Sequence, residues 1–100
     1  MIVVRNVFKL KFGQAKDAVA VFKEGVKLAQ QLGFGSAKPR LFTDLVSDFY
    51  TVVLEHTFES LSDFENSGKT TMGKKEWQAW YQKVVPFIES GHREIFTVVE

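Results

Sequence analysis

Three polar side chains interrupt otherwise apolar patterns, and their chemistry makes them candidates for a functional site. Asn6 and His56 each lie among apolar residues of the same parity in an alternating stretch, and Tyr81 lies in a segment with apolar residues at helical spacing. An amide can orient a carbonyl or a reduced oxygen species, an imidazole can remove a phenolic proton near neutral pH, and a phenol can donate to an oxyanion. These residue types predict a site for a small molecule.

Apolar side chains accompany these polar groups. Trp77 and Trp80 recur at helical spacing and offer flat walls for an aromatic ring. Phe8 and Leu54 share the parity of the polar residue in their own stretches, so a period of two places them on the same faces. A few polar groups in an apolar cleft are typical of a ligand site. We therefore predict catalytic roles for Asn6, His56 and Tyr81, and contacts to an aromatic ligand from Phe8, Leu54, Trp77 and Trp80.

A structural interpretation of the same residues stays open. An asparagine on a strand can bond to neighbouring backbone or to water, and a buried histidine is commonly satisfied by one hydrogen bond. Aromatic residues at helical spacing are commonly core. His56 and His92 have no paired spacing for a metal, and His92 and Arg93 are expected to be surface groups at the entrance of the last strand. No metal site is predicted.

Composition narrows the class of protein. The 100 residues, 45% of them hydrophobic, suffice for one domain over residues 1–100 with a single core. Thirteen basic and 12 acidic residues give a net charge of +1 without a basic run, so nucleic-acid and membrane-surface binding are not expected. The chain has no Cys, which excludes disulfides and thiolate chemistry. The apolar run at 18–22 is too short to span a membrane, and a cytoplasmic protein is expected.

The hydrophobic periodicity predicts the elements that must position these residues. Alternation predicts strands over 2–12, 38–47, 49–58 and 92–99. Three- and four-residue steps predict a helix over 14–32, in which Gly25 is compatible with a tight backbone contact. A second helix begins at Ser60, pauses over the polar segment 66–73, resumes at Lys74, and kinks or ends near Pro86.

The order strand, helix, strand, strand, helix, strand predicts a ferredoxin-like α+β fold, with a four-stranded antiparallel sheet and two helices on one face. The opposite face then needs a partner, because it combines apolar and charged side chains. We expect that partner to be a second copy, packed sheet to sheet. Charges enclosed there would have to pair. The residues concerned are Val3, Val7, Phe49, Thr51 and Val53, with Arg5, Lys9 and Glu55.

Two segments carry a resemblance to a known family. The run NVFKLKFGQAKD at 6–17 resembles the strand-glycine-helix opening of the dimeric α+β-barrel superfamily, and KEWQAWY at 75–81 is similar to its second helix. This superfamily includes the antibiotic-biosynthesis monooxygenases and the NIPSNAP-type proteins. The resemblance covers the whole chain in element order. It implies a homodimer whose sheets close into a barrel, with a pocket in each subunit between sheet and helices.

The resemblance also bears on cofactors. Haem-degrading members use an Asn on the first strand with a Trp and a His on the second helix. Asn6 matches the first position, Tyr81 stands at the His position, and the polar run around Ser67 has no Trp. This implies no haem degradation by that route, although tyrosinate leaves haem binding open. Other members oxygenate quinol-like substrates without metal or flavin. Two hypotheses follow: a cofactor-independent monooxygenase-like enzyme that acts on an aromatic or quinone-like small molecule, or a non-catalytic dimeric module that binds a small hydrophobic ligand.

Overall fold

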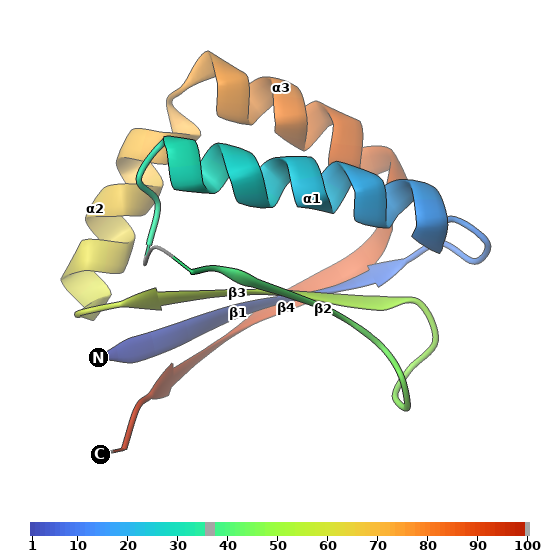
Figure 1. Cartoon of the computed structure of the whole chain (residues 1–100), viewed down its shortest axis with the longest axis horizontal. Helices are drawn as coiled ribbons and strands as arrows, with labels where there is room; N and C mark the ends of the chain where they lie inside the picture. Colours follow the sequence, from blue (N-terminus) through green and yellow to red (C-terminus); the bar gives the residue numbers. More distant parts are fainter. Residues whose placement is uncertain (36–37, 100) are drawn as a thin grey trace.

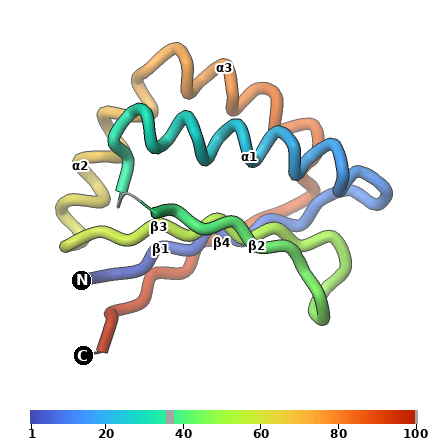
Figure 2. Tube along the Cα trace, in the orientation of Figure 1, coloured from blue at the N-terminus to red at the C-terminus, as the bar shows by residue number. Residues whose placement is uncertain are grey.

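The fold is a four-stranded antiparallel sheet with helices on one face (Figure 1). The computed structural model describes residues 1–35 and 38–99. The sheet order is β2-β3-β1-β4, so the first and the last strand of the sequence are neighbours. Both termini lie at the same end of the sheet (Figure 2). The elements are β1 (Ile2–Leu10), α1 (Ala15–Gln31), β2 (Arg40–Thr43), β3 (Thr51–Phe58), α2 (Leu61–Met72), α3 (Lys75–Val84), the 3₁₀ turn η1 (Val85–Phe87) and β4 (Ile88–Thr97).

The alternation of β1 decides which face meets the helices. Val4 and Leu10 are buried, and Phe8, of the same parity, packs its ring 5.3 Å from Phe22 of α1. The helix α1 buries residues at three- and four-residue steps, as its amphipathic pattern predicts. The ferredoxin-like arrangement is confirmed. The core between the layers comprises Leu10, Ala18, Phe22, Val52, Trp80 and Val84.

The second helical region differs from the prediction. The segment 66–73, predicted to pause, continues α2 as far as Met72, and the break comes at Gly73 and Lys74. Lys74 is extended, with φ −84° and ψ 138°, so the chain turns there and the region forms two helices instead of one. The Ser60 side chain accepts from the backbone N–H of Asp63 and caps α2 as expected. A capped helix tolerates the polar segment because none of its residues is proline.

Strand boundaries also differ. β3 begins at Thr51, two residues after the predicted start, so Phe49 lies in the turn before β3 and not on the open sheet face. β2 pairs only over Arg40–Thr43, because the following residues form the turn into β3. β1 stops at Leu10, and Phe12 beyond it is exposed. β4 begins at Ile88, four residues before the predicted start, because Phe8 pairs with Gly91 and Leu10 pairs with Ile88 across a shift in register. The glycine marks a close approach of two strands and not the entrance to a strand.

Gly25 makes the tight contact that its place in a helix suggested. A β-carbon at this position would lie 2.3 Å from the Trp80 ring. The Trp80 indole N–H donates to the Val21 carbonyl at 2.7 Å, and its ring meets Phe22 edge to face at 6.1 Å. The absent side chain of Gly25 therefore lets α3 approach α1 closely.

We expect Gly25→Ala to lower the free energy of unfolding by about 3 kcal/mol, because the new methyl group overpacks the contact with Trp80. The matched control is Gly68→Ala in α2, where a β-carbon meets nothing within 4 Å. That variant should gain about 0.5–1 kcal/mol from helix propensity. Urea denaturation measures both, and similar changes of the same sign would contradict the packing argument.

Candidate small-molecule site

His56 is a buried imidazole without a hydrogen-bond partner among the described residues. β3 directs it toward the helices between Leu54 and Phe58, and it is 1% exposed. Phe34 meets its ring edge to face at 4.9 Å. Burial lowers the pKa of His56 to about 4, although the nearby Glu55 carboxylate acts in the opposite direction. The imidazole is therefore neutral at pH 7.

This arrangement destabilises the folded protein. A buried polar group that loses its water without gaining a partner costs about 1–3 kcal/mol, and most such groups in native structures are hydrogen-bonded. The structural interpretation of His56, a core histidine satisfied by one hydrogen bond, does not hold within the described residues. A ligand that donates to one ring nitrogen and accepts from the other would satisfy both atoms.

Asn6 has a partner that the sequence pattern did not suggest. Its Oδ1 accepts from Nε of Arg93 at 2.7 Å, across the strand pair β1 and β4. The Arg93 guanidinium carbon lies 5.1 Å from the centre of the Phe64 ring of α2. Arg93 is exposed, as the sequence predicts, and its guanidinium also reaches Asn6 and Phe64 on the helix side of the sheet. The signal that could have found it is register, because with β4 beginning at Ile88, Arg93 stands opposite Asn6.

Asn6 and His56 occupy diagonal positions on one face. Asn6 pairs with Leu54, and His56 follows Leu54 by two residues on the same side of β3. Diagonal neighbours in an antiparallel pair are about 7–8 Å apart. His56, Asn6 and Arg93 therefore form a polar row across β3, β1 and β4.

Aromatic side chains cover this row. The Phe34 ring lies 5.2 Å from that of Phe58 and 6.2 Å from that of Trp77, and Phe58 meets Phe64 at 5.2 Å. These residues come from the loop after α1, from β3, and from α2 and α3. We call the polar row and its cover the His56 site. It comprises His56, Asn6 and Arg93 with Phe34, Phe58, Phe64 and Trp77.

The other residues predicted for the site lie at different distances from it. Leu54 is buried between Asn6 and His56 in register, and Trp77 belongs to the cover. Phe8 and Trp80 pack in the main core, where the indole N–H already donates to a carbonyl. Tyr81 lies on α3 and is 52% exposed. The structure brings the two strand residues together, and the predicted role of Tyr81 in catalysis has no geometric support.

Two surface grooves bear on the location of a ligand. The smaller, of about 320 Å³, lies beside the His56 site; its lining is Met1, Gly33, Gly35, Thr57, Phe58, Glu59, Asp63 and Ser67. The larger, of about 640 Å³, lies between α1 and the turn before β3, where Lys16, Val19 and Tyr50 contribute. Neither is lined by Asn6, His56 or Tyr81. The smaller groove matters more here, because Gly35 and Phe58 separate it from His56.

No cluster of three or more His, Cys, Asp or Glu side chains within residues 1–35 and 38–99 has an arrangement that could hold a metal ion. No helix among them has the length and apolar character needed to cross a membrane.

Comparison with known proteins gives likeness in structure only. No protein-family model matches the sequence, and no curated protein matches it significantly. A NIPSNAP family protein from Agrobacterium tumefaciens superposes with a TM-score of 0.88 at 17% identity, over 99% of this chain and 93% of that one. An uncharacterized NIPSNAP domain protein from Burkholderia xenovorans gives 0.85 at 16%, over 99% and 95%.

An antibiotic biosynthesis monooxygenase superposes with a TM-score of 0.76 at 13% identity, over 100% of both chains. The chain has the fold of these two protein groups. The resemblance in the strand-glycine-helix opening and in the second helix is thereby confirmed at the level of fold. Identities below 20% carry no activity from one protein to another.

We expect His56→Phe to raise the free energy of unfolding by about 1–3 kcal/mol, because it removes two unsatisfied buried atoms and keeps an aromatic ring. It should also flatten the pH dependence. The unfolded histidine binds a proton near pH 6.5 and the folded one only near pH 4, so acid stabilises the unfolded chain between these values. In that window the wild type should lose up to about 1.4 kcal/mol per pH unit.

Chemical denaturation between pH 7 and 5 measures this difference, since carboxylates stay ionised there. The matched control is His92→Gln, because His92 is exposed on β4. That variant keeps the buried His56, so the loss of stability that His56 causes on acidification should remain. A destabilised His56→Phe, or a slope equal to that of the wild type, would show that His56 has a partner in solution.

Proposed function

We propose that this protein binds a small hydroxylated aromatic compound at the His56 site and oxygenates it without a metal or flavin. The observation that carries the proposal is the buried imidazole with two unpartnered nitrogens, beside an arginine-asparagine pair and among aromatic rings. An aromatic ring suits the cover and a hydroxyl suits His56. The fold shared with an antibiotic biosynthesis monooxygenase supports the reaction class by analogy.

The polar row suggests a division of labour. The ligand hydroxyl donates to the neutral His56 imidazole, and the guanidinium of Arg93 stabilises the phenolate that forms when the proton moves. Asn6 holds Arg93 through the 2.7 Å bond to Nε, which leaves the terminal nitrogens of the guanidinium to face an anion. A phenolate bound next to the buried imidazole would stabilise the imidazolium, so we expect ligand binding to raise the low pKa of His56.

The oxidation needs only oxygen and an electron-rich substrate. In an anthrone-type compound, the anion formed by proton loss gives electrons to O₂. The methylene carbon loses two hydrogens and gains one oxygen atom as a carbonyl, and the second oxygen atom leaves as water. The substrate supplies all the electrons, so the balance is one CH₂ group and one O₂ for one C=O and one H₂O. The protein binds, orients and holds the proton.

A non-catalytic alternative has its own supporting observation. Neither of the two grooves described above is lined by Asn6 or His56, and a pKa near 4 makes the free imidazole a weak base. A protein that only binds a small hydrophobic ligand would have the same aromatic cover. Haem is a poor fit for this chain, because Tyr81, the residue at the family's ligand position, is 52% exposed and lines neither groove.

The activity test follows oxidation of an anthrone under oxygen. We expect Asn6→Ala, His56→Ala and Arg93→Ala each to lower kcat/KM by about 100-fold, since each removes a group that binds or moves charge. Arg93→Lys should restore part of the rate, because it keeps the charge and loses the bond to Asn6. His92→Gln is the control and should match the wild type. Quenching of tryptophan fluorescence without turnover would favour the binding module, and equal rates throughout would remove these residues from the mechanism.

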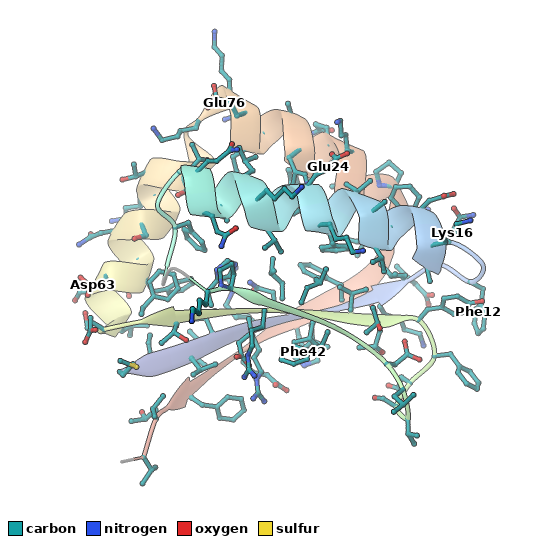
Figure 3. All side chains as sticks on the ribbon, in the orientation of Figure 1. Phe12, Lys16, Glu24, Phe42, Asp63 and Glu76 are labelled. Carbon is teal, nitrogen blue, oxygen red and sulfur yellow. The ribbon has the colours of Figure 1, made fainter. Side chains whose placement is uncertain are left out.

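We also propose that two copies pack through their open sheet faces. This face is uncovered in Figure 1, and Phe42 lies on it, on the far side of the sheet from the helices (Figure 3). Phe96 of β4 is 50% exposed and lies on the same face. β1 contributes Val3 and Arg5 to this face. Exposed aromatic residues on a small domain favour a protein partner.

Glu55, Arg5 and Arg40 form a paired set of charges on the open face. Glu55 is 5% exposed and accepts from Arg5 at 2.9 Å and from Arg40 at 2.7 Å. Burial by itself would raise the pKa of Glu55, but the bonds and charges of both arginines outweigh it and lower that pKa. The guanidinium carbon of Arg5 lies 5.5 Å from the ring centre of Phe96, and that of Arg40 lies 5.0 Å from the ring centre of Phe42. When a second sheet excludes water, desolvation costs less free energy for a paired, hydrogen-bonded set than for isolated charges.

Light scattering after size exclusion tests this proposal at micromolar concentration. We expect the mass of a dimer, and the mass of a monomer for Phe96→Asp, because a carboxylate would face the partner sheet. The matched control is Phe12→Asp, since Phe12 is 69% exposed but lies beyond the end of β1. A monomeric wild type, or dimers of both variants, would overturn the proposed interface.

A further inference from the structure

We infer that the ring of Phe34 occupies the place of the ligand's ring, and that a phenol-type ring binds by displacing it. This inference rests on the proposed function for the nature of the ligand. Phe34 meets His56 edge to face at 4.9 Å, meets Phe58 at 5.2 Å and lies 6.2 Å from Trp77. A single aromatic ring is thus already surrounded by aromatic side chains, with His56 in contact with it.

The phenylalanine ring fills this place but forms no hydrogen bond to His56. It fits the apolar surroundings, but it carries no donor or acceptor, so both nitrogens of His56 stay unpartnered. A ring of the same size with a hydroxyl group would keep the aromatic contacts and add a hydrogen bond to the imidazole. Replacement of the Phe34 ring by such a ligand therefore adds a hydrogen bond to His56. This bond favours hydroxylated rings over plain hydrocarbons.

The backbone of Phe34 is held in place, so only its side chain needs to move. The N–H groups of Gly33 and Phe34 donate to the carbonyls of Gln30 and Ala29, which ends α1 in a Schellman motif. Gly33 has the positive φ of 73° that this motif requires. The backbone of Phe34 is therefore fixed to α1, and displacement of its ring takes place by rotation of the side chain.

Gly35 keeps the space beside His56 open. Its φ is also 73°, but a β-carbon there would lie 3.2 Å from Cβ of His56, 3.3 Å from the Phe58 ring and 3.4 Å from Nδ1 of the imidazole. The groove of about 320 Å³ lies on the outer side of Gly33, Gly35 and Phe58. This groove provides the path for the ligand and space for the displaced ring of Phe34.

Binding of phenol and toluene to variants tests the inference without turnover. Phe34→Ala vacates the ring's place, so we expect it to bind phenol at least about tenfold more tightly than the wild type does, and about tenfold more tightly than toluene. The preference for phenol should vanish in Phe34→Ala/His56→Phe. The control is Phe22→Ala, which removes a ring from the main core, away from His56, and should show no preference for phenol. Calorimetry measures all four proteins.

A pair of glycine variants provides a second test if Phe34→Ala does not fold. Gly33→Ala and Gly35→Ala carry the same backbone strain at φ 73°, but only the second crowds His56. We expect phenol at millimolar concentration to shift the ring signals of His56 in NMR spectra of the wild type and of Gly33→Ala, and not of Gly35→Ala.

These outcomes are distinct from failure of the proposed function. A wild type that does not oxidise anthrone, together with a Phe34→Ala variant that prefers phenol through His56, leaves the inference standing and removes the enzyme. Equal affinity of Phe34→Ala for phenol and toluene, or a phenol preference in Phe22→Ala, overturns the inference. Equal NMR responses of the two glycine variants overturn it as well.

Discussion

The close contact between Gly25 and Trp80 sets the distance between the helices, and the rest of the structure depends on it. The indole ring lies where a side chain of residue 25 would be, and its N–H donates to the Val21 carbonyl. Trp80 also packs on Phe22, while its neighbour Trp77 lies 4.7 Å away and extends the aromatic layer toward Phe34. The contact that closes the core thus also positions one wall of the His56 site.

The two halves of the helix-facing layer follow different physical rules. The main core is apolar, and its one tryptophan N–H is hydrogen-bonded. The His56 half keeps a neutral imidazole unsatisfied beside a hydrogen-bonded asparagine and arginine. A folded protein that retains such a group gives up stability at that position. Function is the ordinary reason for a local departure from good packing, so the poorly satisfied half is the better place for a ligand.

On the open face of the sheet, ion pairs offset the cost of burying a carboxylate. Glu55 is nearly inaccessible to water although no helix covers it, because Arg5 and Arg40 close over it from β1 and β2. The pairing of Arg5 with Glu55 follows from the predicted need of enclosed charges for partners, and the register of β1 and β3 places them opposite each other. Arg40 joins them from the short edge strand. A buried carboxylate that is hydrogen-bonded to two arginines loses less stability than an isolated charge when a second sheet excludes water.

Periodicity along the chain was enough to predict the order of the strands and helices, the sides of β1 and β3, and the position of Asn6 and His56 on one face, because a period of two acts within each strand. The place of Gly25 inside a helix was compatible with a tight contact, but it did not identify Trp80 as the partner. The groups that these residues meet depend on packing between elements. Arg93 reaches Asn6 because β4 starts early and fixes the register, and Phe34 reaches His56 because the end of α1 turns its loop back over β3. Tyr81 and the break at Lys74 depend on helix packing, which local periodicity does not specify.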